Sequence, residues 1–172
     1  TANLSTGENT VLNDAVPAPT DIEGDLDANG YALDTDASSG SLTFNNDGSY
    51  SFDPGTDFDD LAVGESRDET FTYTASDTNG GTSTPATITI TVTGTNDAPV
   101  ANTDNPSTGE NTVLNDSVPA PTDLEGDLDA NGYALDTDVG SGSLTFNADG
   151  TYSFDPGTDF DDLAVGESRD ET

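Results

Sequence analysis

The chain has 172 residues, of which 35 are Asp or Glu and two are Lys or Arg, giving a formal net charge of −33 at pH 7. Such a charge excludes nucleic acid and anionic lipid as partners, because both are bound through clustered Lys and Arg. Cys, His, Met and Trp are absent, which excludes disulfides and the zinc, copper, haem and iron–sulfur sites built on thiolate or imidazole ligands. No apolar stretch approaches 18 residues, so no membrane insertion is expected.

Short alternating runs of Thr, Val, Ile, Tyr and Phe, bounded by Gly, Asn, Asp and Pro, predict an all-β fold rather than an acidic disordered chain. The strands expected in chain order are 8–12, 31–36, 42–44, 50–52, 71–75 and 87–93. The turn 45–48 contains Gly and closes a hairpin whose four large side chains share one face. Segment 60–65 is expected to be a short turn or a single helical turn that fills the end of the core with Leu61 and Val63. Together these signals predict a seven-stranded β-sandwich of immunoglobulin or cadherin type.

The chain repeats itself with an offset of 102 residues. Residues 1–70 align with 103–172 without a gap and differ at eight positions. A repeat of this length is a whole domain, not a solenoid turn. We assign a complete repeat to 1–98, a linker to 99–102 and a second repeat, which lacks the last two strands, to 103–172. Tandem domains this similar favour a spacer or array over an enzyme.

The inter-repeat segment 94–100 contains Pro99. Proline fixes its own φ angle and restricts the preceding residue, here Ala98, to extended conformations. The sequence therefore predicts a short, stiff connection.

Oxygen ligands gather at the predicted loops and in the linker, in the groups Asp21/Glu23/Asp25, Asp34/Asp36, Asp77/Asn79 and Asn96/Asp97. Each close carboxylate pair costs about 1 kcal/mol even at the dielectric constant of water. A calcium ion, which takes six to eight oxygen ligands from flexible loops, removes that cost. The alternative is a solvated acidic surface, and the further stretch Asp53, Asp57, Asp59 and Asp60 is compatible with either interpretation. No EF-hand loop is present.

Other functions find less support in the sequence. A carboxylate pair can serve a glycosidase, but there is no Trp platform and no pair differs from the others, so neither catalysis nor a small-molecule substrate is expected. The Thr row of strand 87–93 could form an ice-binding face, although Thr is common on the solvent face of strands.

The segments LAVGE, TFTYTASD, NGG and ITVTGTNDAP, in this order within residues 47–99, resemble the VCBS repeat and its bacterial cadherin-like relatives. The resemblance implies a calcium-stabilised β-sandwich from the extender region of a giant RTX-type adhesin. It also implies type I secretion, an extracellular location on the surface of a Gram-negative marine bacterium, and adjacent copies of the repeat as partners in cis.

The resemblance further implies calcium ligands. In cadherins such ligands come from a first-strand Glu, an Asn-Asp linker and Asp residues in loops of the next domain, and the acidic loop is particular to the bacterial repeats. The matching residues are Glu8 and Glu110; Asn96 and Asp97; Asp34, Asp36, Asp77, Asp136 and Asp138; and, for the acidic loop, Asp21, Glu23 and Asp25 with their repeat counterparts Asp123, Glu125 and Asp127.

From these residues we hypothesise that calcium bridges the Asn96–Asp97 linker to Glu8 and the loop 21–25 of the same repeat, and to Asp136 and Asp138 of the next. Without calcium the carboxylates repel and the junction flexes. The alternative is a calcium-dependent module that binds a glycan, for which Tyr31 beside Asp34 is the weak candidate, or that pairs with its own kind.

Overall fold

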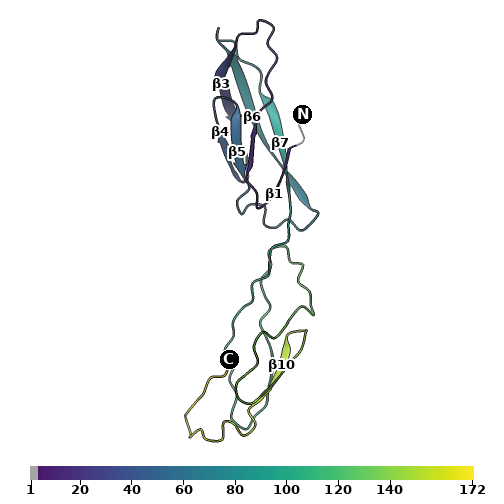
Figure 1. Cartoon of the computed structure of the whole chain (residues 1–172), viewed down its shortest axis with the longest axis vertical. Coiled ribbons are helices and arrows are strands. Elements are labelled where there is room, and N and C mark those ends of the chain that lie inside the picture. The colour runs from purple at the N-terminus through teal and green to yellow at the C-terminus, as the bar shows by residue number, and fades with distance from the viewer. Residues whose placement is uncertain (1–3) are drawn as a thin grey trace. The chain divides into compact units, whose positions relative to one another are not determined.

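The structure is a computed structural model that describes residues 4–172. The chain divides into two compact units, the first ending at Asp97 and the second spanning Ala98–Thr172. Every regular element within the described residues is a β-strand (Figure 1). That part of the chain has no helix of sufficient length and apolarity to cross a membrane.

The first unit is a sandwich of two sheets, as the sequence predicts. One sheet has the strand order β1-β7-β6-β3 and the other the order β2-β5-β4. Strand β1 runs parallel to β7, and all other neighbours in these sheets are antiparallel. The strands are β1 (Leu4–Gly7), β2 (Leu12–Ala15), β3 (Leu26–Thr35), β4 (Ser41–Phe44), β5 (Ser49–Asp53), β6 (Ser66–Asp77) and β7 (Ala86–Thr93).

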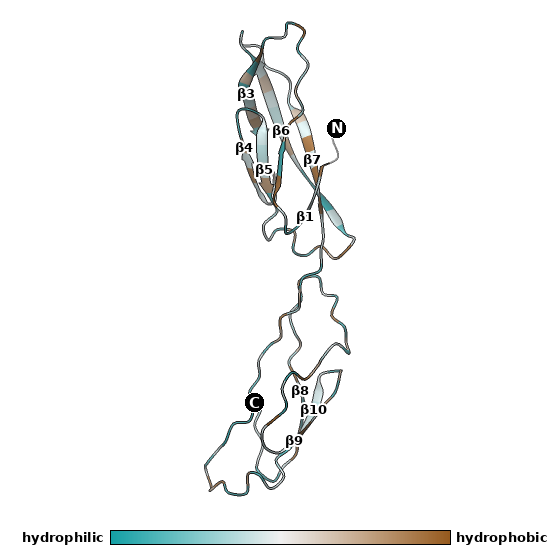
Figure 2. Cartoon of the chain, viewed as in Figure 1, coloured by the Kyte–Doolittle hydropathy of each residue, from teal (hydrophilic) through white to brown (hydrophobic). Residues whose placement is uncertain are grey.

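The core lies between the two sheets and follows from the alternation of the strands (Figure 2). Every second residue of a strand faces the same side, so Phe71 of β6 meets Tyr50 of β5, and Tyr73 of β6 meets Phe44 of β4. Each such side chain contributes roughly 1.5–3 kcal/mol on burial. The buried cluster comprises Val16, Tyr50, Phe52, Phe58, Leu61, Phe71, Tyr73, Ile88, Ile90 and Val92.

The first predicted strand is wrong. Residues 8–11 form the turn between β1 and β2, because the Thr10 N–H donates to the Gly7 carbonyl at 3.0 Å and the Thr6 hydroxyl donates to the Thr10 carbonyl at 2.6 Å. Both hydrogen bonds stabilise a reversal of the chain just after Gly7. Glu8 therefore lies just beyond the end of β1 instead of inside a strand.

The predicted hairpin is confirmed. Leu42 pairs with Phe52 and Phe44 with Tyr50, so all four side chains share a face. The turn segment 60–65 is confirmed in part, since Leu61 is buried but Val63 is 68% exposed. Tyr31, considered above for glycan stacking, packs against Tyr73 with ring centroids 6.3 Å apart, and so belongs to the periphery of the core.

The second unit contains one regular sheet. Its strands are β8 (Leu114–Ser117), β9 (Ser143–Phe146) and β10 (Thr151–Asp155), in the order β8-β10-β9, which matches β2-β5-β4 of the first unit. Residues 128–137, the repeat counterpart of β3, are not assigned as a strand. In the first unit β3 pairs with β6, and most of the sequence of β6 has no counterpart in residues 98–172.

Candidate metal centre

Glu8 is a buried carboxylate at the end of the first unit where β7 leads into the linker. The residue is only 1% exposed to solvent. Its backbone N–H donates to the Thr93 carbonyl at 3.0 Å, which fixes the start of the turn beside the end of β7. Oε1 accepts hydrogen bonds from the Thr95 N–H and the Thr95 hydroxyl, both at 2.7 Å.

The second oxygen of Glu8, Oε2, is buried and has no hydrogen-bond partner. Buried polar atoms are almost always paired, and each exception calls for an explanation such as an ion or water. Burying a carboxylate is costly unless its charge is compensated. A buried carboxylate with one unpaired oxygen is therefore the arrangement expected of a cation ligand.

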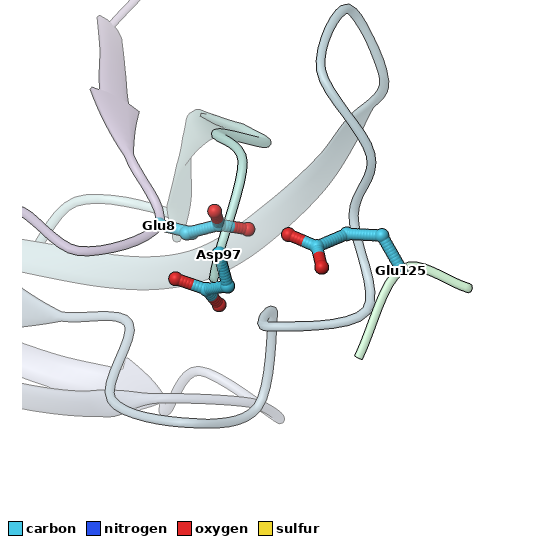
Figure 3. Close-up of side chains that lie close together, drawn as sticks. All are labelled: Glu8, Asp97 and Glu125. Atoms are coloured by element: carbon cyan, nitrogen blue, oxygen red, sulfur yellow. The ribbon is translucent and has the colours of Figure 1, made fainter. Parts of the chain in front are cut away.

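Asp97 lies beside Glu8. A carboxylate oxygen of Asp97 and one of Glu8 are within 4.8 Å of each other (Figure 3). Two negative charges at this separation repel by about 1 kcal/mol in bulk water and by more where water is excluded. Glu125, the other side chain drawn in Figure 3, belongs to the loop 123–127 of the second unit.

Asp59 is a third carboxylate at this end of the first unit. Partial burial raises its pKa above the ordinary value, and the negative charges of Asp97 and Glu8, followed by those of Asp57 and Asp60, raise it further. Asp59 therefore interacts electrostatically with both other carboxylates. The sequence marks it only as part of an acidic stretch, and the additional signal is the neighbouring Phe58, which is fully buried and anchors the turn.

Arg67 holds the turn that carries Asp59. Its guanidinium donates to the Asp57 carbonyl at 3.0 Å and to the Asp60 carboxylate at 2.7 and 3.0 Å. It also lies 5.4 Å from the centre of the Phe58 ring, within the range of a cation–π contact. These contacts pair the charge of Asp60 and fix the turn that carries Asp59.

A second acidic group lies in the loops 21–25 and 77–81. The Asp21 carboxylate accepts hydrogen bonds from the Asp25 N–H at 3.0 Å and the Glu23 N–H at 3.3 Å, and the Asn79 amide contacts the Asp25 carboxylate. Asp77 accepts from the N–H groups of its own loop at 2.8 Å.

The charges of this second group interact. The pKa of Asp25 is raised, first by its hydrogen bond with Asp21, then by desolvation and the charges of Asp21 and Asp77. Desolvation alone would raise the pKa of Asp21 also, but hydrogen bonds from Asp25 and Glu23 outweigh it and lower that pKa. Asp21, Asp25 and Asp77 thus form one cluster.

The two acidic groups are at opposite ends of the first unit. Strand β6 begins at Ser66 opposite Thr93 and ends at Asp77 opposite Leu26. Its 12 residues span about 40 Å at roughly 3.3 Å each. One calcium ion therefore cannot contact both the linker and the loop 21–25 of the same repeat, since the length of the sheet separates them.

Asp34 and Asp36 join neither group. Asp34 accepts a hydrogen bond from the Thr72 hydroxyl at 2.8 Å, near the middle of β6, and the Asp36 carboxylate accepts from the Ala37 N–H at 2.8 Å. In the second unit Asp136 and Asp138 likewise contact their immediate neighbours Thr137 and Val139. A role of Asp136 and Asp138 toward the preceding repeat remains a prediction.

The remaining predicted ligands have local contacts. The Asn96 amide donates to the Asp97 carbonyl at 2.7 Å. Asp123 accepts from the Gly126 N–H at 2.8 Å, within the loop that also carries Glu125 and Asp127. Glu110, the counterpart of Glu8, is half-buried and accepts from the Asn111 amide at 3.3 Å.

These features define a class of protein: a seven-stranded sandwich, built as a tandem repeat, with a buried carboxylate where the chain leaves the domain. Residues 1–94 match the family described as Bacterial cadherin-like domain, and the chain belongs to this family. Domains of this kind are typical of bacterial surface adhesins, are usually non-enzymatic, and generally bind calcium.

A solved structure titled "D00-D0 domain of Intimin" aligns with 90% of this chain and 82% of its own, with 17% sequence identity and a TM-score of 0.39. No curated protein matches the chain significantly.

Proposed function

We propose that the repeat is a calcium-stabilised structural spacer of a bacterial surface adhesin. Calcium binds at Glu8, Asp59 and Asp97 and stiffens the point at which one repeat leads into the next. The observation that carries this proposal is the buried, unpaired Oε2 of Glu8.

The donor set suits calcium by its chemistry. Glu8, Asp59 and Asp97 offer only carboxylate oxygens, which are hard ligands, and nitrogen and sulfur ligands are absent from the sequence. Three carboxylates supply between three and six of the six to eight oxygens that calcium takes, and water and backbone carbonyls supply the rest. Magnesium suits the set less well, since it demands octahedral geometry and retains its waters.

The linker has few residues left to flex. On one side the Gly94 N–H donates to the Glu65 carbonyl at 3.0 Å and Thr95 binds Glu8. On the other side Val100 pairs with Thr122 inside the second unit. Only residues 96–99 lie between these anchors, and they include Pro99 with its fixed φ angle. A cation on Asp97 would immobilise one more of these residues.

The stabilisation expected from calcium binding is modest for one site and large for an array of sites. Extracellular calcium modules bind at about 10⁻⁴–10⁻³ M, and at about ten times the dissociation constant a site adds roughly 1.4 kcal/mol. We place the array outside a Gram-negative, marine cell, exported by type I secretion in the RTX manner. In the low-calcium cytoplasm the junctions would stay flexible, and outside they would stiffen and hold a binding domain away from the membrane.

Small-angle scattering tests the proposal on this chain and on an array of four complete repeats. Each is measured in EDTA, in 5 mM magnesium and in 5 mM calcium. We expect the maximum dimension of the array to lengthen toward that of a rod in calcium only. An array whose profile is the same in all three buffers would show that the acidic residues are surface charge and that the spacer does not depend on calcium.

A further inference from the structure

The turn 77–81, which follows β6, contains the pair Asn79–Gly80. It lies at the opposite end of the first unit from Glu8, so it has no part in the proposed calcium site. Two other Asn-Gly pairs occur, at 29–30 in β3 and at the repeat counterpart 131–132. In such a pair the main-chain nitrogen of Gly can attack the side-chain amide of Asn, because Gly has no Cβ to obstruct the approach. The packing around each pair determines whether this reaction occurs in the folded domain.

The main chain at Gly80 is open to solvent. Its φ angle is +91°, and no atom of the described residues lies within 4 Å of a Cβ built there. The Gly80 N–H donates to the Asp77 carbonyl at 3.4 Å, a length at which hydrogen bonds are weak. Asn79 itself is exposed. Water therefore reaches both reacting groups, and little packing opposes the rotation that brings them together.

The pair Asn29–Gly30 is enclosed by comparison. A Cβ at Gly30 would lie 2.7 Å from the Ser76 carbonyl oxygen, which is a backbone atom of the neighbouring strand. The next residue, Tyr31, pairs with β6, and its N–H donates to the Asn46 carbonyl at 3.1 Å. Rotation of the main chain at this pair therefore requires local opening of the sheet.

We propose that Asn79 is a deamidation site of the folded domain. The Gly80 nitrogen loses its proton and attacks Cγ of Asn79. The new C–N bond closes a succinimide ring, the bond from Cγ to the amide nitrogen breaks, and that nitrogen leaves as ammonia. Water then opens the ring at either carbonyl, which gives aspartate or an isoaspartate whose main chain runs through Cγ. One water is consumed and one ammonia is released, and no other reactant is needed.

The product changes the contact between two loops. The Asn79 amide contacts the Asp25 carboxylate, and the Thr78 N–H donates to the Asp25 carbonyl at 3.0 Å. Asp25 already lies in a cluster with Asp21 and Asp77. After deamidation a carboxylate replaces a hydrogen-bond donor and repels the charges of this cluster. The loops 21–25 and 77–81 should therefore separate.

Isoaspartate also disrupts the turn itself. Asp77 Oδ1 accepts hydrogen bonds from the N–H groups of Asn79 and Gly81, both at 2.8 Å. Isoaspartate adds a methylene group to the main chain between these two donors, so the two hydrogen bonds cannot both persist. Both products of the reaction thus weaken the same turn.

The test is incubation of the whole chain at 37 °C, at pH 7.4 and pH 8.5, in water enriched in oxygen-18. Mass spectrometry of chymotryptic peptides then follows each Asn-Gly pair separately. We expect label at Asn79, faster at pH 8.5 because the attacking nitrogen must lose a proton. Its rate should be roughly ten times that at Asn29, where the sheet must open first. When urea unfolds the chain, the two rates should become similar, because the packing that distinguishes the pairs is lost.

Two variants test the consequence of the reaction. Asn79→Gln keeps an amide that can contact Asp25 but closes a ring much more slowly, so it should acquire no label at this position. Asn79→Asp reproduces one product, and hydrogen exchange at Thr78 should be several-fold faster than in Asn79→Gln, with no change at Glu8.

Two results would overturn the site: no label at Asn79 in the folded chain while the unfolded chain is labelled, or equal rates at Asn29 and Asn79 in the folded chain. Equal hydrogen exchange at Thr78 in the two variants would overturn the separation of the loops. The readouts are independent of calcium, so the proposed calcium site can fail without affecting them.

Discussion

Glu8 and Thr95 are joined by two hydrogen bonds to a single carboxylate oxygen, one from the Thr95 N–H and one from its hydroxyl, both 2.7 Å long. The Thr95 hydroxyl in turn accepts from the Asn9 amide at 3.2 Å, which orients its proton toward Glu8. The carboxylate is thus held by Oε1, and Oε2 is left for another ligand. These hydrogen bonds attach the linker to the domain and also fix the orientation of the Glu8 carboxylate.

Glu8→Gln should abolish the stabilisation of the first unit by calcium. The amide keeps the size of the side chain but removes the charge that calcium requires, so the gain of roughly 1.4 kcal/mol at about ten times the dissociation constant should disappear. In EDTA the variant should be as stable as the parent or more so, since a like-charge contact is relieved. Thermal unfolding with and without calcium measures both effects.

The repeat provides a matched control for this variant. Glu110→Gln makes the same change at the counterpart of Glu8, where no Thr95 equivalent lies within the 172 residues. It should leave the calcium response of the first unit intact. An equal loss of response in both variants would place the site elsewhere.

Without calcium, mild acid should stabilise the first unit. The pKa values of Asp59 and Asp25 are raised above the ordinary 3.8 in the folded state. The folded state therefore binds more protons than the unfolded state around the raised values, and stability is present below 3.8 and lost as pH rises through the folded pKa. Lowering the pH from 7 toward 4 in EDTA should raise the melting temperature.

Asp59→Asn isolates one contribution to this pH dependence. The variant should show a smaller gain in mild acid, because a group that repelled Asp97 and Glu8 is neutral at every pH. In saturating calcium the parent should show the opposite trend, since protonation of the carboxylates releases the ion. A melting temperature in EDTA that falls steadily from pH 7 to pH 4 would contradict the assignment.

The sequence predicts the strands through their alternation and their turns. Leu42, Phe44, Tyr50 and Phe52 lie where the pattern places them, because register in a hairpin follows from the turn and from the period of two. The expected strand 8–12 is wrong, because this segment has the composition of a strand but the Thr6–Thr10 hydrogen bond makes residues 8–11 a turn. A local hydrogen bond between polar residues produces no hydrophobic periodicity, so the sequence pattern does not reveal it.

The candidate site was only partly predictable, because its members come from three distant segments. The importance of Glu8 and Asp97 came from the family resemblance, and their proximity required the parallel pairing of β1 with β7. Asp59 stands in a run with Asp57 and Asp60, and composition cannot tell which of the three is partly buried. The buried Phe58 and the Arg67–Asp60 pair decide this, and both are tertiary contacts.

Gly94→Ala should disrupt the site without changing any ligand. A Cβ at Gly94 would lie 2.2 Å from the Leu61 carbonyl oxygen and 2.5 Å from that of Ala62, and both are backbone atoms. The linker must therefore move away from the turn 61–65, taking Thr95 and Asp97 with it. We expect a loss of roughly 1–3 kcal/mol in stability and a weaker calcium response, measured by unfolding in EDTA and in calcium.

Gly7→Ala is the control for this steric argument. Gly7 immediately precedes Glu8, but a Cβ there meets nothing closer than the Thr10 hydroxyl oxygen at 3.6 Å, an ordinary contact. Its calcium response should equal that of the parent. If Gly94→Ala retains the full response as well, the close packing of the linker on the turn is not needed for binding.

Tyr50→Phe should make the protein more resistant to alkali. Burial, and secondarily the charge of Asp14, raise the pKa of Tyr50 to about 12, and its hydroxyl is buried without a hydrogen-bond partner. A folded-state pKa above the unfolded value of 10.0 gives stability that is complete below pH 10 and lost as pH rises to 12. Phe removes this loss, and it removes an unpaired buried hydroxyl, so stability at pH 7 should be unchanged or higher.

Tyr152→Phe, the same change at a half-buried counterpart, should protect less, and unfolding curves at pH 8, 10 and 11 compare the two. Equal alkaline loss in the parent and in Tyr50→Phe would show that another group governs unfolding at high pH.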